Sequence, residues 1–253
     1  MTLSGQAAIA GVYEHPSRWA PEKTEFQLMA ESARGALDDC GLTLGDVDGL
    51  FAASMSMGIM GVVQLSEYLN LKPRHLDGTN IGGSSFVAHV SHAAAAIHAG
   101  LCDVALVLYG STAASNAMAI GTGGGAGRDP AAAFVGPYGM TTVGSYALVA
   151  QQHMKRFGTT SEQLAEIAVT MRRHASLNPD AKMRKPITVD DVLESRLISD
   201  PLHLLDCCII SDGGGAVVVT SRERARDLRR EPVPILGCGE AVAHQELGAP
   251  DLL

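Results

Sequence analysis

The stretch Asn80–Ile97, NIGGSSFVAHVSHAAAAI, has the residue types of an active-site turn. An apolar segment typical of a helix follows two glycines and two serines, Gly82, Gly83, Ser84 and Ser85. The first amides of a helix have no intrahelical partner, and together with the helix dipole they stabilise negative charge. Such a turn could donate backbone N–H groups to an oxyanion or a thioester oxygen. The alternative is a tight packing turn, since glycine lets two elements approach closely.

The serines of this turn are a second possible source of chemistry. Neither Ser84 nor Ser85 lies in a G-x-S-x-G pattern, so the sequence does not support a hydrolase-type nucleophile. His89, His92 and His98 follow on the expected helix, where the first two share a face. A metal site would need a third ligand, and the sequence has no H-E-x-x-H pattern. We therefore expect structural histidines and no metal site.

Two other glycine-rich stretches give weaker signals. Gly121–Gly127 matches G-x-G-x-x-G/A, but no suitable strand precedes it, so we predict a loop and not a dinucleotide site. In Ser211–Ser221, SDGGGAVVVTS, we expect Asp212 to bond backbone amides in the turn and Gly213–Gly215 to allow a close approach near a site. A plain tight turn is the alternative. We expect Cys207–Cys208 to be buried free thiols.

The elements around the first turn alternate between strand and helix. Apolar runs predict strands over 7–16, 46–55, 75–83 and 102–111. Helical periodicity predicts helices over 24–41, 62–71 and 86–99. Thr24 is the expected N-cap of the first helix, and Gly41 is its expected C-terminal stop. This alternation is typical of a parallel sheet with helices on both faces.

After residue 111 the alternation stops. Helical patterns return over 144–158, 161–179 and 188–199. We expect Thr188 to cap the last of these helices, and Ser161 to form only half of a capping box. Residues 112–206 are therefore predicted to be a helical insertion. A strand over 207–221, a helix over 222–230 and the start of another strand at 233 follow it.

The composition argues against several classes of partner. The formal net charge of -8 argues against a nucleic acid or an anionic membrane as partner. No apolar run reaches the length of a membrane span, and the N-terminus lacks the basic region of a signal peptide. Five cysteines, an odd number without regular spacing, favour free thiols in a reducing compartment. We expect a cytoplasmic protein.

The order of these motifs resembles the N-terminal half of the thiolase superfamily, and within it the sterol-carrier-protein-x-type, lipid-transfer-protein-like thiolases. The resemblance covers essentially the whole chain and rests on DVDGLFAA, CDVALVLYGS and SDGGGAVVVTS in this order. It implies an α/β, thiolase-like layered fold, with a mostly parallel five-stranded sheet, helices on both faces and a helical insertion. Family members have two similar halves. The implied parts are the first half (1–111), the insertion (112–206), the return strand and helix (207–232), and the start of a truncated second half (233–253).

The resemblance makes Gly83 the decisive residue. Thiolases carry their acyl-accepting cysteine in a turn at this place, and the matching position here is Gly83, followed by Ser84 and Ser85. A glycine cannot be acylated, and a neutral serine is a poorer nucleophile than a thiolate. The chain therefore resembles thiolase-like aldolases that cleave a β-hydroxyacyl-CoA, as in steroid side-chain degradation, and that work with a small OB-fold partner. We predict that the turn acts through its backbone amides and that none of its residues is acylated.

Two other functions remain open at this point. The protein could be an acetyl-CoA acyltransferase that uses a different nucleophile, or a non-catalytic thiolase-like subunit of a complex. In each case the resemblance implies an acyl-CoA ligand, with coenzyme A as part of the substrate and no tightly bound cofactor. It also implies a homodimer, with the contact near 75–83. We predict that Arg184 and Lys185, in the basic insertion, bind the nucleotide phosphates; the alternative is an ordinary solvated surface.

Overall fold

The computed structural model describes residues 3–53, 57–117 and 141–242. It divides into two compact units. The first unit is formed by Met1–Asn116 and Ser211–Ala241, and the second by Ala117–Ile210 and Val242–Leu253. The glycine-rich stretch Gly121–Gly127, predicted above to be a loop, lies outside the described residues.

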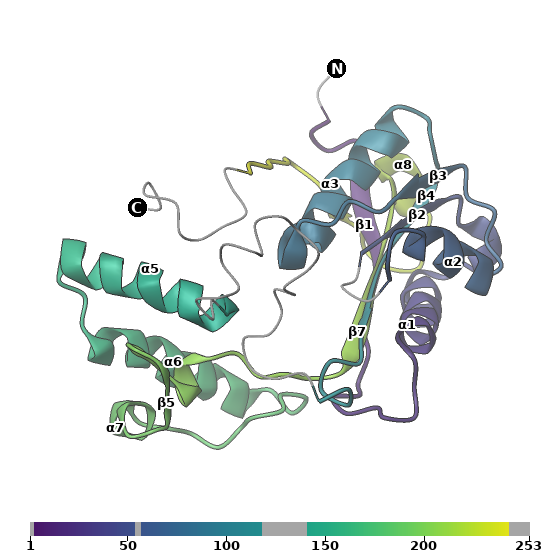
Figure 1. The fold of residues 1–253 in the computed structure, drawn as a ribbon. Helices are drawn as coiled ribbons and strands as arrows, with labels where there is room; N and C mark the ends of the chain where they lie inside the picture. Colours follow the sequence, from purple (N-terminus) through teal and green to yellow (C-terminus); the bar gives the residue numbers. More distant parts are fainter. Residues whose placement is uncertain (1–2, 54–56, 118–140, 243–253) are drawn as a thin grey trace. The chain divides into compact units, whose positions relative to one another are not determined.

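The first unit contains the predicted alternation of strands and helices (Figure 1). Its strands are β1 (Ala7–Glu14), β2 (Gly49–Ala52), β3 (His75–Asp77), β4 (Val104–Ser111), β7 (Gly213–Ser221) and β8 (Val233–Pro234). Its α-helices are α1 (Glu25–Cys40), α2 (Gly61–Tyr68), α3 (Ser85–His98) and α8 (Arg222–Ala225). Short 3-10 turns lie at Leu44–Asp46 and Gly82–Ser84. The predicted α/β class is confirmed.

The strands form one sheet in the order β3-β2-β4-β7-β1-β8. The pairs β3–β2 and β2–β4 are parallel, with Leu50 of β2 opposite Leu106 of β4. The strand β7 lies antiparallel between β4 and β1, and β8 pairs antiparallel with the other edge of β1. Within the described residues the sheet thus has six strands instead of the predicted five, because the two residues of β8 extend it.

The direction of β7 follows from where the chain re-enters the first unit. Gly213, the first residue of β7, pairs with Ser111, the last residue of β4. A strand that starts beside the C-terminal end of β4 must run back along it. The antiparallel β7 therefore separates the parallel strands β2–β4 from β1, which runs in the same direction as they do.

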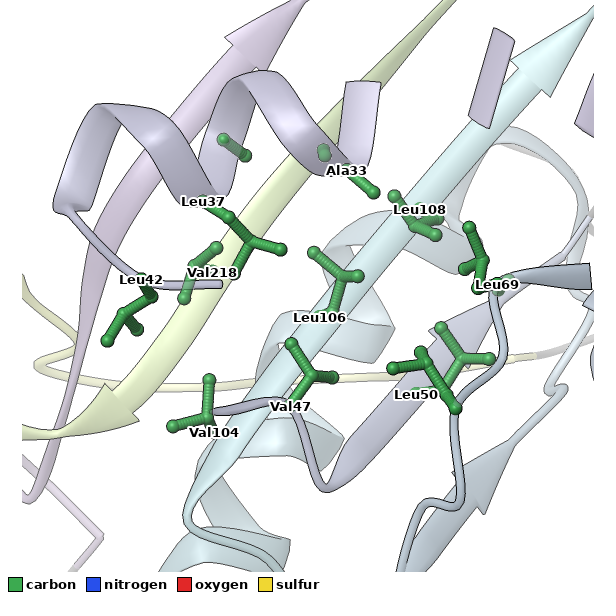
Figure 2. Close-up of a cluster of buried hydrophobic side chains, with 14 of the residues drawn as sticks. Ala33, Leu37, Leu42, Val47, Leu50, Leu69, Val104, Leu106, Leu108 and Val218 are labelled. Atoms are coloured by element: carbon green, nitrogen blue, oxygen red, sulfur yellow. The ribbon is translucent and has the colours of Figure 1, made fainter. Parts of the chain in front are cut away.

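Two apolar layers cover the two faces of this sheet. Helices α1 and α2 cover one face, where Leu50, Leu106 and Val218 of the strands form one buried cluster with Leu37 and Leu69 (Figure 2). On the other face, α3 packs its alanines on alternate residues of the same strands, Phe51, Ala105, Val107 and Val219. Burying both faces requires the nearly continuous apolar strands seen in the sequence. The expected helices on both faces are confirmed.

The end residues of α1 are those expected. Thr24 accepts from the Gln27 amide, and the Gln27 side chain accepts from the Thr24 amide, which completes a capping box. Gly41 ends the helix in the left-handed region, with φ of 81°. A Cβ at Gly11 of β1 would collide with the Ala36 carbonyl oxygen and with Cys40. Glycine at this position thus lets α1 approach β1 closely.

The second unit is mainly helical. Its described elements are α5 (Thr142–Phe157), α6 (Ser161–Leu177), α7 (Val189–Leu193), a 3-10 turn (Leu204–Asp206) and a hairpin of β5 (Leu197–Ser199) and β6 (Leu202–His203). Thr188 caps α7 as expected. The expectation for Ser161 was wrong by one residue: Thr160 is the N-cap of α6 and forms a complete capping box with Gln163. In the described part of the chain, no helix has the length and apolarity needed to cross a membrane.

Candidate functional site

The Gly82–Ser84 turn runs directly into α3, as the sequence predicted. Gly82 has a φ of +79°, in the left-handed region that favours glycine. Gly83 and Ser84 are exposed. A Cβ built on Gly83 would meet no other atom within 4 Å. Packing therefore does not explain the missing side chain at Gly83.

Ser85 is fully buried, and its hydroxyl holds the turn together. The hydroxyl donates to the Gly82 carbonyl oxygen at 2.6 Å and accepts from the Ile81 amide at 2.9 Å. Because both bonds go to backbone atoms of the turn, the Ser85 hydroxyl shapes the turn and is not presented to a ligand. Ser84, in contrast, lies at the surface.

The backbone amides of the turn also differ from one another. The Gly82 amide donates to the Asn80 side-chain oxygen at 3.2 Å, and the Ser85 amide donates to the Gly82 carbonyl oxygen. Within the described residues, no hydrogen bond is seen from the Gly83 amide, and the Ser84 amide is the last N–H group of the 3-10 turn. The exposed Gly83 N–H group can donate to a carbonyl or anionic oxygen.

A partly buried polar network supports the chain just before the turn. Asp77 Oδ1 accepts from the Thr79 amide at 2.8 Å and from the Thr79 hydroxyl at 2.7 Å. The ring Nε2 of His89, on α3, bonds the Thr79 carbonyl oxygen at 2.9 Å. Burial raises the pKa of Asp77, but the Thr79 hydroxyl and amide and His92 outweigh burial and hold it below its usual value. Asp77 is thus an anionic acceptor at neutral pH.

The two histidines on this face of α3 have different environments. His89 is fully buried, and this burial lowers the pKa of its ring. His92 Nδ1 bonds Asp77 Oδ2 at 2.6 Å, and His92 Nε2 bonds Glu240 at 3.1 Å. Partial burial opposes the charged form of His92, but the two carboxylates outweigh it and raise its pKa. No group of three potential metal ligands occurs among the described residues.

A groove of about 690 Å³ lies beside the first turn of α3. Phe86, two residues after Ser84, lines this groove and packs against Tyr109 of β4 with ring centroids 4.7 Å apart. The wall of the groove is completed by Gly213–Gly215 at the start of β7 and by the end of β1. The groove lies where α3 does not cover the sheet, and its lining is mostly apolar. It can therefore accept the apolar part of a ligand next to the turn.

Asp212 joins two loops at the edge of this groove: it bonds backbone amides, as expected, but those of two distant loops and not those of its own turn. Its side chain is 1% exposed. One carboxylate oxygen accepts from the Ala20 amide at 2.8 Å, and the other accepts from the Ala114 and Ser115 amides at 2.9 and 3.0 Å. Burial raises the pKa of Asp212, but these amides outweigh burial and lower it overall. The carboxylate therefore has a structural role, holding the loops after β1 and β4.

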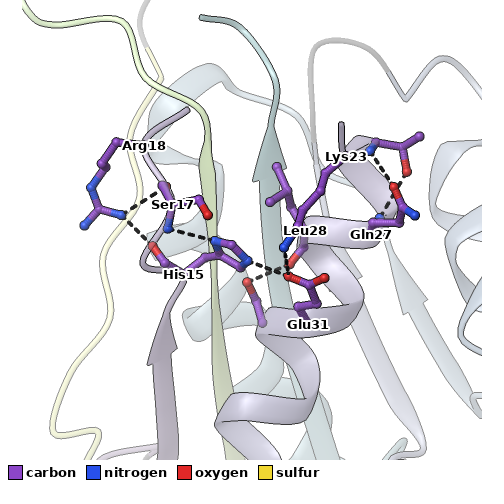
Figure 3. Close-up of polar contacts among 9 residues, drawn as sticks. His15, Ser17, Arg18, Lys23, Gln27, Leu28 and Glu31 are labelled. Atoms are coloured by element: carbon purple, nitrogen blue, oxygen red, sulfur yellow. Dashed lines mark hydrogen bonds and ion pairs between the residues drawn. The ribbon is translucent and has the colours of Figure 1, made fainter. Parts of the chain in front are cut away.

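A second network lies after β1, close to the groove residue Arg18 (Figure 3). His15 is 2% exposed; its Nε2 bonds Glu31 at 2.6 Å, and its Nδ1 accepts from the Ser17 amide at 3.1 Å. The Lys23 ammonium also bonds Glu31, at 2.6 Å. Its hydrogen bond, followed by that of His15, lowers the pKa of Glu31. The network ties the loop after β1 to α1 and leaves neither His15 nitrogen free for a ligand.

The basic residues predicted to bind phosphate lie in the second unit, on the segment after α6. Arg184 donates to the Ser176 carbonyl oxygen at 3.3 Å, and Arg172 donates to the Lys185 carbonyl oxygen at 3.1 Å. Arg184 and Lys185 are both exposed. No ion pair of either side chain is seen among the described residues. Each can therefore accept an anionic group from solvent.

Sequence reasoning missed Asp77 and the structural role of Ser85. Asp77 is five residues before the turn and fifteen residues from His92, a separation that follows no helical or strand period. The sequence did contain one indication: Asp77 and Thr79 are two positions apart, a spacing that is typical of an Asx-type turn. It identifies Asp77 as an acceptor for the local backbone.

No family model matches the chain. Among curated proteins, it is 36% identical to a steroid side-chain-cleaving aldolase of Thermomonospora curvata, over 96% of this chain and 64% of the relative. It is also 36% identical to the 17-hydroxy-3-oxo-4-pregnene-20-carboxyl-CoA lyase of Mycobacterium tuberculosis, over 92% of this chain and 62% of the relative. The chain thus spans less than two thirds of the length of these two relatives.

Two solved structures are similar as well. A structure described as an Ltp2-ChsH2(DUF35) aldolase has a TM-score of 0.86 and 32% identity, and the match covers 97% of this chain and 64% of that chain. Human mitochondrial 3-ketoacyl-CoA thiolase has a TM-score of 0.61 at 14% identity, over 89% of this chain and 66% of that chain. The second likeness concerns the fold alone.

Proposed function

The chain belongs to the thiolase superfamily, and from this premise we propose that the whole protein is a lyase that cleaves a β-hydroxyacyl-CoA in steroid side-chain metabolism. The observation that supports this most directly is the turn at Gly83. Gly83 is exposed and has space for a side chain, but it carries no nucleophile. The two curated relatives, an aldolase and a CoA lyase by name, support the same reaction class.

The proposed reaction is a retro-aldol cleavage. A base removes the proton from the β-hydroxyl group, the β-carbon becomes a carbonyl, and the Cα–Cβ bond breaks. Its electron pair passes to the thioester as an enolate, which is then protonated at carbon to give a shortened acyl-CoA. The amides of Gly83 and Ser84 donate to the thioester oxygen, where the negative charge develops. No residue of the turn is acylated, and the Ser85 hydroxyl keeps the turn in shape.

The assay that tests this proposal separates cleavage from thiolysis. The full-length protein, with its partner subunit, is given a steroid β-hydroxyacyl-CoA without free coenzyme A. We expect equal amounts of a ketone or aldehyde and a shortened acyl-CoA, because retro-aldol cleavage needs no second thiol. Product formation only from a β-ketoacyl-CoA with added coenzyme A would instead identify a thiolase with another nucleophile. Activity with neither substrate would favour a non-catalytic subunit.

We also propose that Arg184 and Lys185 bind the phosphates of coenzyme A. Reversing both charges, in R184E/K185E, should weaken acyl-CoA binding about 10-fold or more, since two attractive contacts become repulsive. Isothermal titration of the full-length protein measures this, and E162Q, which changes an exposed charge at the start of α6, is the control. Unchanged affinity would mean that the two residues are an ordinary solvated surface.

The proposed assembly is a homodimer in contact near 75–83, together with a small OB-fold partner protein. The strand β3 is an edge strand of its sheet, and Leu76 on it is 40% exposed. Pairing two such edges would cover unpaired backbone groups. Sedimentation of the full-length chain should give a dimer at micromolar concentration, and a monomer would refute this contact. The cytoplasmic location and the absence of a tightly bound cofactor remain predictions.

A further inference from the structure

The chain that leads into the turn is held at Thr79, through each hydrogen-bonding group of that residue. Its amide and hydroxyl donate to Asp77, and its carbonyl oxygen bonds His89. The next residue is Asn80, whose side chain accepts from the Gly82 amide. The path from β3 into the turn is therefore determined by Asp77 on one side and by α3 on the other.

The contact with the Thr79 carbonyl oxygen explains why the polar His89 ring is buried. Its ring lies near Phe51 and Phe86, with centroids 6.2 and 6.1 Å away. Its Nδ1 is buried and has no hydrogen-bond partner within the described residues. Leaving a buried polar atom unpaired is unfavourable. The one bond that His89 does make goes to the Thr79 carbonyl oxygen, so this bond accounts for a polar ring at an otherwise apolar position.

His92 connects the network to a distant part of the chain. It bonds Asp77 through Nδ1 and Glu240 through Nε2, and the His89 ring is 6.3 Å from its own. The groups that face His92 are therefore Asp77 from β3, His89 from α3 and Glu240 from the segment after β8. A positive His92 between two carboxylates keeps the Asp77 side chain oriented toward Thr79.

We propose that Asp77, His89 and His92 are positioning residues, which hold Thr79 so that the Gly83 and Ser84 amides point at one oxygen, and that Glu240 strengthens this arrangement through the His92 charge. This rests on the proposed function only for the identity of that oxygen. None of the three side chains takes part in bond breaking.

The arrangement has a defined pH dependence. Two carboxylates raise the pKa of His92, so its charge and the contribution of that charge are fully present below the ordinary pKa of histidine. The contribution is lost as the pH rises through the raised pKa. The pKa of Asp77 is lowered, so Asp77 stays ionised across this range. At alkaline pH, loss of the His92 charge should therefore loosen the turn.

The space at Gly83 allows a reporter that does not depend on catalysis. In G83C the new side chain meets no neighbour at its Cβ. Exposed N–H groups at a helix start lower the pKa of a thiol and speed its alkylation. The pH dependence of iodoacetamide labelling, read by peptide mass spectrometry on the full-length chain, therefore reports the alignment of the turn amides. Mapping by peptide separates this thiol from Cys238 and from Cys207 and Cys208, which are partly buried and exposed respectively, so the expectation that this pair is buried was wrong.

Adding H89A or D77A to G83C should slow labelling at neutral pH by roughly 5-fold. H89Q, which keeps a donor near the position of Nε2, should restore it. H92N keeps a donor to Asp77 but cannot carry charge, so the alkaline change in labelling should disappear. H98Q, on an exposed residue of the same helix, is the control. Labelling within 2-fold of the G83C parent in H89A, D77A and H92N would overturn the proposal.

In the enzyme with Gly83 intact, H89A should lower kcat about 10-fold with little change in KM, as for other residues that orient a reacting group. H89Q should recover most of the loss. If wild-type protein cleaves no β-hydroxyacyl-CoA, the proposed function fails, while the thiol reporter still decides on the positioning network. If cleavage occurs but H89A lowers kcat and labelling no more than H98Q does, the positioning role is refuted.

Discussion

Replacing Ser84 by proline is expected to lower kcat for C–C cleavage by about 100- to 1000-fold, the range seen when one oxyanion donor is removed. Proline lacks the N–H group that we assign to the thioester oxygen. The backbone accepts the change, since Ser84 has a φ of -77° and proline requires about -65°.

The control for this prediction is Ser84→Ala, which removes the hydroxyl and keeps the amide. It should leave kcat within about 3-fold of wild type, because Ser84 is exposed and its side chain makes no capping bond. The two variants are compared by steady-state kinetics on the full-length protein. Equal losses in both would identify the hydroxyl as the active group. An acyl ester trapped on Ser84 would contradict the retro-aldol mechanism directly.

Ser85 has to be tested separately, because the structure changes the expected result. Considered from sequence, the two serines looked interchangeable. The structure shows that Ser85 is buried and joins Ile81 to Gly82. Ser85→Ala should therefore weaken the turn as well as activity. A loss of activity in that variant alone does not identify a nucleophile.

Much of the first unit could be predicted, because its signals are local. Thr24 and Gly41 bound α1 through residues that are adjacent in sequence, and continuous apolar runs mark β1 and β4.

In the second unit, the hairpin of β5 and β6 was missed because strands of three and two residues are too short to show a period. The cap at Thr160 was missed by one residue, since both Thr160 and Ser161 are suitable caps.

The candidate site was less predictable, because it is made by residues that meet only after folding. The turn itself is contiguous and was found. The groove beside it is lined from four separate segments, around Val12, Phe86, Tyr109 and Gly214, and no spacing in the sequence relates them. The partners of Asp212 could not be identified either: Ala20 and Ala114 are 192 and 98 residues away from it. Only the type of its contact, to backbone amides, followed from the sequence.

Asp212→Ala is expected to have the largest effect on stability, about 3–5 kcal/mol of unfolding free energy. Removing the carboxylate leaves the amides of Ala20, Ala114 and Ser115 without their acceptor, in a place where water has little access to the first of them. Asp227→Ala removes an exposed carboxylate from the same unit and should change stability by less than about 0.5 kcal/mol. Urea unfolding followed by the fluorescence of Trp19, next to Ala20, measures both.

The effect of Asp212→Ala on stability should depend on pH. The amides lower the pKa of Asp212, so the carboxylate stabilises the fold fully above the ordinary pKa of an aspartate, and this contribution is lost as the pH falls through the lowered pKa. The stability difference between wild type and D212A should thus be constant from pH 5 to 8 and shrink below about pH 4. D212N should be intermediate, because its amide keeps one acceptor oxygen and turns a donor toward another donor. A difference that did not shrink in acid would mean that the variant acts by repacking the two loops and not by removing a charged acceptor.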